Sequence, residues 1–414
     1  MFPVVNSYLN SLIWIWIFIF LAALIVLSQY IILFFVKSKN LGIGKMSSTM
    51  HLSLLNWVIG LIQGILYAIV GFCIFQMFYG EEYYTNILSI IATISFSVEI
   101  FVLGLLTLKL VNWCKLNKSK ILWMFILSSS SLAITGILMN FQINILFENS
   151  LSRVSDDMPG ISPALAGNSL IEFLQGSYFI FALVSFTLMW ITTAFLLYHY
   201  SKKVGNRKYW LIIAIPLVFY LSQFIFLSTE IFAILINSNP FFYIIALNTV
   251  YSMSLPIGGI LFAVAFLMMA KTVGKDNPNV QNYLKLSAYG ILLIFVASQT
   301  TITRLNFPPF GILSISVIGL ASYILFIGMY SSAISASIDK ELMRSIRRAT
   351  IQKAQFLHNI AEAEIISHVL KITKSQEEKW KEEVGIESSL SEEETKDYLE
   401  KVLLEIKQLK ATKK

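Results

Sequence analysis

The sequence has few charged residues, few cysteines and few histidines for its length. Charged residues make up 13% of its 414 residues, whereas roughly a quarter of residues are charged in a water-soluble globular protein. The two cysteines, Cys73 and Cys114, fall on opposite sides of the membrane that is predicted below, so they cannot pair in a disulfide. The four histidines form no pair at membrane depth and no cluster with zinc spacing. We therefore predict no metal site, no haem and no other cofactor.

Signatures of catalysis and of nucleic-acid binding are also missing. The hydrophilic end of the sequence has no glycine-rich phosphate loop, and no nucleophile–base motif occurs anywhere. The net charge of +7 is not gathered in a basic stripe on a soluble face, which nucleic-acid binding requires. The sequence thus predicts a protein that is not an enzyme, has no catalytic residues and binds no nucleic acid.

What the sequence does have is a series of long apolar runs, and 56% of its residues are hydrophobic. Nine runs can be drawn, at residues 10–36, 52–79, 86–112, 121–146, 170–198, 209–236, 241–270, 282–304 and 309–336. Each exceeds the roughly 20 residues that a helix needs to cross a bilayer. None shows the alternating polarity of membrane β-strands. We predict an all-α, multi-pass helical bundle of about nine spans in the cell membrane, with the lipid bilayer as its main partner.

Basic residues sort into alternate gaps between these runs. The first 338 residues hold sixteen basic residues, and fourteen of them share one set of gaps. The fourteen are Lys37, Lys39, Lys45, Lys109, Lys115, Lys118, Lys120, Lys202, Lys203, Arg207, Lys208, Lys271, Lys275 and Lys285. The other gaps hold mostly acidic residues, with only Arg153 and Arg304 against the trend. Because basic residues near span ends stay in the cytoplasm, we predict an external N-terminus and a cytoplasmic C-terminus.

The C-terminal part differs sharply in composition from the rest. Residues 339–414 hold thirty of the chain's fifty-five charges, so we divide the chain into a transmembrane body, 1–338, and a cytoplasmic amphipathic helical tail, 339–414. No proline or glycine occurs between Ser331 and Glu383, which predicts that the last span continues into the tail as one helix. The heptad spacing in the tail is compatible with a coiled coil.

Two apolar faces in the tail predict a protein contact. The first tail helix carries Phe356, Ile360 and Ala363 on one face, and a second carries Tyr398, Val402 and Ile406. An apolar face of a short helix has to be buried against something. We expect these six residues to dock a cytoplasmic protein partner or to mediate self-association.

One carboxylate lies in the middle of a predicted span and is the first candidate for a functional site. Glu99 is the only ionisable residue at that depth, and an intramembrane carboxylate is a functional candidate by default. The structural alternative is a protonated, hydrogen-bonded side chain. Glu172, Glu230 and Arg304 fall near external span ends, where they would form either an ion-pair cluster or the mouth of a ligand or ion site.

A helix kink is predicted in the seventh run. Pro256 is followed by Gly258 and Gly259, and proline removes a backbone hydrogen bond where glycine lets the chain bend. Such a kink either exposes carbonyl groups at a transport site or is an ordinary packing feature.

Two short resemblances bear on function. The segment Phe356–Glu362 resembles the histidine-kinase phosphoacceptor box, with Glu362 where the phosphorylated histidine stands in that family. The run from Tyr330 through Arg348 resembles uncharacterised multi-span membrane proteins of ammonia-oxidising archaea. The layout is similar to the multi-span sensor regions of prokaryotic receptors, and this implies a helical tail that signals.

These observations leave three hypotheses open. The first is a receptor or sensor-like membrane protein that relays a signal to a cytoplasmic partner through the tail. The second is a secondary transporter or permease that uses Glu99. The third is a structural or accessory subunit of a membrane complex, with the tail as its docking element.

Overall fold

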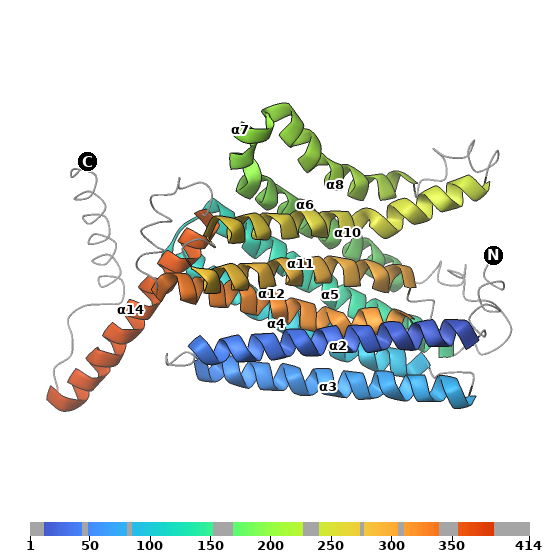
Figure 1. The fold of residues 1–414 in the computed structure, drawn as a ribbon, viewed down its shortest axis with the longest axis horizontal. Helices are drawn as coiled ribbons and strands as arrows, with labels where there is room; N and C mark the ends of the chain where they lie inside the picture. Colours follow the sequence, from blue (N-terminus) through green and yellow to red (C-terminus); the bar gives the residue numbers. More distant parts are fainter. Residues whose placement is uncertain are drawn as a thin grey trace.

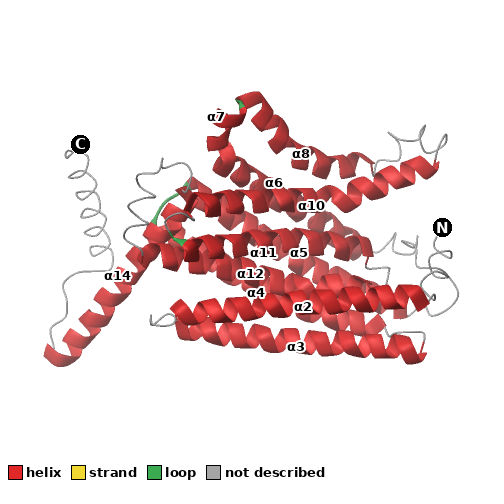
Figure 2. Cartoon of the chain, in the orientation of Figure 1, coloured by secondary structure: helices red, strands yellow, loops and turns green. Residues whose placement is uncertain are grey.

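The structure is a computed structural model, and it describes most of the chain. The described residues are 12–43, 49–80, 85–151, 169–226, 240–273, 277–304, 310–338 and 355–384. Within them the chain forms helices joined by short loops, without a β-strand (Figure 2). The helices are α2 (Leu12–Ile43), α3 (Thr49–Gly80), α4 (Thr85–Leu116), α5 (Lys120–Leu151), α6 (Ser169–Leu197), η1 (Tyr198–Tyr200), α7 (Ser201–Val204), α8 (Asn206–Phe226), α10 (Pro240–Val273), α11 (Pro278–Arg304), α12 (Phe310–Ile338) and α14 (Gln355–Val384).

Eight of these helices are long and apolar enough to cross a membrane. They are α2, α3, α4, α5, α6, α10, α11 and α12, and they confirm a multi-pass helical membrane protein. The sixth predicted span, 209–236, begins in α8, but its second part, 227–236, lies outside the described residues. The count of nine spans and the orientation of the termini therefore stay predictions.

Helix α12 is the centre of the bundle, and the hairpin of α2 and α3 is its edge. Within the apolar span of α12, 89% of the residues are buried, against 17% in α2. Helix α12 packs against α11, α4, α3 and α2 (Figure 1). The exposed apolar side chains of α2, among them Phe20 and Phe34, suit a helix that faces lipid tails.

Glycine allows α11 and α12 to approach very closely. A Cβ atom added at Gly290 would lie 2.5 Å from the backbone nitrogen of Leu325, and one at Gly328 would lie 2.5 Å from the backbone nitrogen of Ser287. Small residues at a helix interface are typical of membrane bundles, where close packing drives association. The two glycines thus set the distance between α11 and the central helix.

Polar side chains cross between helices inside the bundle. The Gln63 amide of α3 donates to the Gln29 side chain of α2 at 2.8 Å and lies 3.3 Å from the Ser316 carbonyl oxygen of α12. The Ser95 hydroxyl of α4 donates to the Ile315 carbonyl oxygen of α12. Such bonds satisfy polar groups that have no water partner in a membrane, and they hold the outer helices on α12.

The tail helix α14 is docked on one end of the bundle, and the prediction of one helix from the last span into the tail is wrong. In one straight helix, Glu364 would lie about 51 Å from Tyr330, yet Lys109 contacts both side chains. The Phe356 ring packs against Phe125 of α5, with ring centroids 4.6 Å apart, and against Phe266 of α10 at 6.3 Å. Burial of the apolar face of α14 against the body stabilises this docked position. Figure 1 shows α14 leaving the end of the bundle at an angle.

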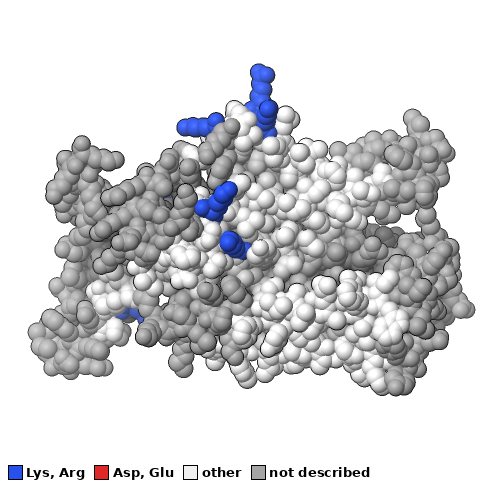
Figure 3. Space-filling model, in the orientation of Figure 1, with Lys and Arg blue, Asp and Glu red and all other residues white. Residues whose placement is uncertain are grey.

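Basic side chains gather at the end of the bundle that carries α14. Lys118 lies in the α4–α5 loop, Lys202 in α7, and Lys271 in the last turn of α10. In Figure 3 the visible described Lys and Arg side chains lie over this half of the molecule. The end marked as cytoplasmic by the sequence is therefore also the end where α14 docks.

Candidate functional site

Glu99 lines a cavity inside the bundle. Its side chain is 3% exposed, and its Oε2 atom has no hydrogen-bond partner in the part of the chain that the structure describes. The cavity has a volume of about 50 Å³, which is room for one or a few water molecules. A buried, unpartnered carboxylate oxygen beside an open space is a site where a ligand can supply the missing contact.

Five helices form the walls of this cavity. Most of the lining is apolar, and hydroxyl groups interrupt it at Tyr178 of α6, Thr135 of α5, Ser185 of α6 and Ser298 of α11. The apolar lining comprises Phe96, Leu132, Met139, Ala182, Phe186, Leu255 and Phe295. We call these residues, with Glu99 and Gly136, the Glu99 cavity. It contains no basic side chain.

Gly136 leaves the carboxylate its space. A Cβ atom added at Gly136 would lie 3.3 Å from Glu99 Oε2, so a larger side chain here would press on the carboxylate. Serine residues hold the neighbouring α5–α6 interface, where the Ser128 and Ser185 hydroxyls each donate to the other residue's carbonyl oxygen at 3.2 Å. Small residues thus bring α5 close to both its neighbours and shape the cavity wall.

The glycines of the predicted kink place two aromatic walls. Helix α10 contains Pro256 and changes direction part way along in Figure 1. A Cβ atom at Gly258 would lie 2.3 Å from the Phe186 ring, and one at Gly259 would lie 2.9 Å from the Phe295 Cβ atom. These glycines therefore have a packing role, because they let both phenylalanines stand between α10 and its neighbours at the cavity.

A second polar cluster lies next to the cavity. The Ser254 hydroxyl of α10 lies 3.0 Å from the Gln223 side-chain oxygen of α8 and 3.3 Å from the Gln299 side-chain oxygen of α11. All three residues are buried, and Ser254 precedes the cavity residue Leu255. The cluster joins α8, α10 and α11 beside the cavity.

The tail junction is the other concentration of chemistry in the molecule. Glu364 of α14 accepts a hydrogen bond from the Trp113 indole of α4 at 2.7 Å and forms an ion pair with Lys109 at 3.1 Å. The Lys109 ammonium also lies 4.9 Å from the centroid of the Tyr330 ring of α12, within the range of a cation–π interaction. One carboxylate of the tail is therefore held by α4, which is itself held on α12.

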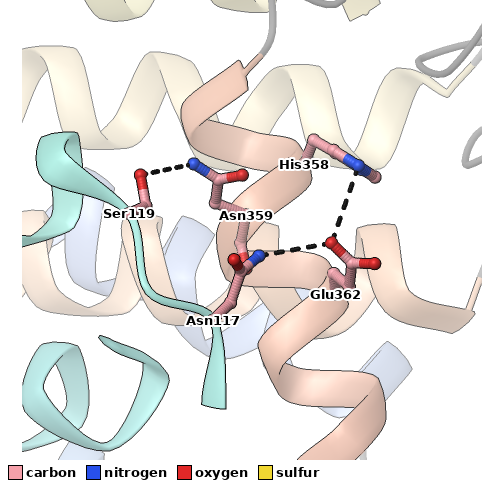
Figure 4. A network of polar contacts seen from close by, with 5 residues as sticks. All are labelled: Asn117, Ser119, His358, Asn359 and Glu362. Carbon is pink, nitrogen blue, oxygen red and sulfur yellow. Dashed lines mark hydrogen bonds and ion pairs between the residues drawn. The ribbon is translucent and has the colours of Figure 1, made fainter. Parts of the chain in front are cut away.

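A network of amides extends the junction to the α4–α5 loop (Figure 4). The Asn359 amide donates to the Ser119 hydroxyl at 2.7 Å, and the Asn117 amide donates to Glu362 Oε2 at 3.2 Å. The same Glu362 oxygen lies 3.7 Å from His358 Nε2, one turn earlier on α14. These contacts fix the rotation of α14 about its axis, because they lie beside its apolar face.

The tail residues predicted to dock a partner contact the body instead. Phe356, Ile360 and Ala363 are fully buried and belong to the core of the body. The tail is therefore not detached from the body at this point. Tyr398, Val402 and Ile406 lie outside the described residues, so their role stays a prediction.

The structure leaves the predicted external cluster untested. Glu230 and the side chains of Glu172 and Arg304 lie outside the described part. Sequence analysis missed Lys109 and Glu364 as a site, because Lys109 served only as a marker of the cytoplasmic side. Lys109 and Glu364 are 255 positions apart in the sequence, and only their opposite charges would suggest that they form an ion pair.

Among the described residues, no group of three or more His, Cys, Asp or Glu side chains is placed to hold a metal ion. Comparison with known proteins finds no matching family model, no matching curated protein and no matching solved structure. The resemblances noted in the sequence therefore stay predictions.

Proposed function

We propose that this protein is a non-enzymatic membrane receptor in which the Glu99 cavity receives a small ligand and the docked helix α14 is the output. One observation supports this proposal most: α4 serves both sites. Glu99 of α4 lines the cavity, and Lys109 and Trp113 of the same helix hold Glu364. Ten residues of helix between Glu99 and Lys109 span about 15 Å. A shift of α4 at the cavity therefore moves the side chains that hold the tail.

Signalling requires a second arrangement, which we propose is an undocked α14. A receptor acts by shifting the balance between discrete states. In the docked state Phe356 and Ile360 are covered by the body. Undocking would expose this apolar face, and a cytoplasmic partner could then cover it. We therefore propose that Phe356 and Ile360 bind the partner only when α14 is undocked.

A cavity-filling substitution tests this coupling. Gly136→Leu places apolar atoms against Glu99 Oε2 and imitates an occupied cavity. In lipid nanodiscs, we expect amide hydrogen exchange at residues 355–366 to rise about tenfold, which corresponds to about 1.4 kcal/mol of lost docking.

The matched control is Gly104→Leu. Gly104 lies on α4 itself, and a Cβ atom there would meet nothing within 4 Å, so the same change in size and helix propensity leaves the cavity alone. If both folded variants leave exchange in α14 unchanged, the Glu99 cavity does not control the tail and the proposal fails.

A second function, secondary transport, has one observation in its favour. The cavity reaches the single mid-span carboxylate, and its Oε2 atom lacks a partner among the described residues. Against it stands the mostly apolar lining, which provides no continuous polar path. A transporter predicts that Glu99→Gln abolishes ion-driven flux in proteoliposomes that carry an internal pH dye. Equal flux in the wild type, this variant and protein-free liposomes would remove transport as an alternative.

A further inference from the structure

We infer that the Glu99 cavity binds a small primary ammonium ion, with the –NH₃⁺ group at Glu99 and the short carbon chain against the aromatic walls. This inference rests on the proposed receptor function only for its consequence at the tail. The binding site itself is argued below from the cavity.

Charge is the first reason. Glu99 is 3% exposed, and no basic side chain lines its cavity. The nearby cation on α4, Lys109, is paired with Glu364 at 3.1 Å. A buried carboxylate is costly unless a counter-charge and hydrogen bonds compensate it. A cationic ligand supplies the charge that the described chain does not place there.

Hydrogen-bond polarity is the second reason. The Thr135 hydroxyl donates its hydrogen to the Leu132 carbonyl oxygen at 2.6 Å, and the Ser185 hydroxyl donates its hydrogen to the Ser128 carbonyl oxygen at 3.2 Å. Each hydroxyl has one hydrogen and two lone pairs, so each oxygen, having donated its hydrogen, can only accept a hydrogen bond from a ligand. With the carboxylate of Glu99, these two hydroxyls offer three acceptor groups, and the hydroxyls of Tyr178 and Ser298 also line the cavity. An ammonium group offers three donors.

The aromatic walls are the third reason. Phe186 stacks on Tyr220 with ring centroids 4.0 Å apart and lies edge-on to Phe295 at 6.1 Å. Both phenylalanines line the cavity. Aromatic faces attract ammonium groups most strongly when water is excluded. They also receive the carbon atoms of an organic cation, which an inorganic ion does not have.

Size limits the ligand. A cavity of about 50 Å³ compares with the roughly 150 Å³ of an engineered cavity that binds benzene. It fits an ion with very few heavy atoms, so methylammonium is the probe of choice. Metal ions of higher charge are disfavoured by the single carboxylate and the absence of a metal-ligating group of three among the described residues.

The test measures thermal stability of the full chain in lipid nanodiscs against methylammonium chloride, methanol and sodium chloride. A ligand that binds the folded state raises Tm in a saturable way. We expect methylammonium to do so and methanol and sodium to have no effect at matched concentration and ionic strength. Glu99→Gln should weaken methylammonium binding at least tenfold.

A matched pair of threonine variants keeps the test decisive if Glu99→Gln fails to fold. Thr135→Val removes an acceptor from the cavity, and Thr107→Val removes a hydroxyl of α4 that also donates to its own helix, at 2.8 Å to the Leu103 carbonyl oxygen. We expect the Thr135 variant to bind methylammonium severalfold more weakly than wild type. The Thr107 variant should bind it as wild type does.

Three results would overturn the inference. Equal stabilisation by methanol would show an apolar or neutral-acid site, and Glu99-dependent stabilisation by sodium would show an inorganic cation site. No saturable effect of methylammonium would exclude this class. Amide hydrogen exchange in α14, recorded in the same samples, separates the receptor proposal from the ammonium-binding proposal. Binding without a change in α14 contradicts the receptor function alone, and a response of α14 to Gly136→Leu without methylammonium binding contradicts the ligand class alone.

Discussion

At the scale of single residues, two charged side chains decide how the tail meets the body. Lys109 and Glu364 are only 24% and 13% exposed, so water replaces a lost partner poorly. The Trp113 indole donates to the same carboxylate, and removal of the carboxylate would strand two groups at once. Leaving buried polar groups unsatisfied costs about 1–3 kcal/mol each.

We therefore predict that Glu364→Gln and Lys109→Met each loosen the tail and that their effects are not additive. Each single variant should raise amide exchange at residues 355–366, because each breaks the 3.1 Å ion pair. The double variant should exceed the worse single variant by little, since both remove one interaction. A full double-mutant cycle by hydrogen exchange measures this. Additive effects would show that the pair does not hold α14.

Residue-level prediction from the sequence succeeded only where a residue was unusual for its surroundings. Glu99 stood out because a carboxylate in an apolar run is rare, and it does line a cavity. Gly136 and Thr135 lie in an ordinary apolar run, and their position opposite Glu99 depends on how α5 packs. Side-chain pairs between helices have no periodic signal, so the walls of the cavity could not be predicted.

At the scale of elements, length and hydropathy predicted the transmembrane helices, whereas their packing needed the structure. Eight apolar runs became eight helices suited to cross a membrane, because backbone groups in lipid have to bond within the segment. The prediction that the last span and the tail form one straight helix was wrong, because Lys109 contacts both Tyr330 and Glu364. Local sequence from Ser331 to Glu383 favours a continuous helix, but the Phe356 ring packs against Phe125 and Phe266 of the body.

The close contact of α11 with α12 gives a prediction at this scale. Gly290→Ala should lower the free energy of unfolding by about 1–3 kcal/mol or more. The added Cβ atom would lie 2.5 Å from the backbone nitrogen of Leu325, and a backbone atom cannot move aside by changing a rotamer. The control is Gly60→Ala on α3, where a Cβ meets nothing within 4 Å. Thermal unfolding in mild detergent compares the two. Equal stability of both variants would contradict the packing described for α12.

At the scale of the whole molecule, charge and docking point to the same end of the bundle. Lys118 precedes α5 and Lys120 is its first residue, and their neighbours Asn117 and Ser119 contact the tail. The positive-inside tendency would place this end, and α14 with it, in the cytoplasm. A receptor needs its output on the cytoplasmic side if the partner is a cytoplasmic protein.

Orientation is tested with one introduced cysteine on each side. The native thiols Cys73 and Cys114 are buried, and both are replaced so that the chain carries one cysteine at a time. Thr373 of α14 is exposed, so Thr373→Cys places a reactive thiol on the tail. A membrane-impermeant maleimide should label it in inside-out vesicles and not in intact cells, because translocating the basic loops is costly. Ser162→Cys, in the external loop predicted from the sequence, should show the reverse. Labelling of Thr373→Cys in intact cells would invert the topology, and the proposed output would then lie outside the cell.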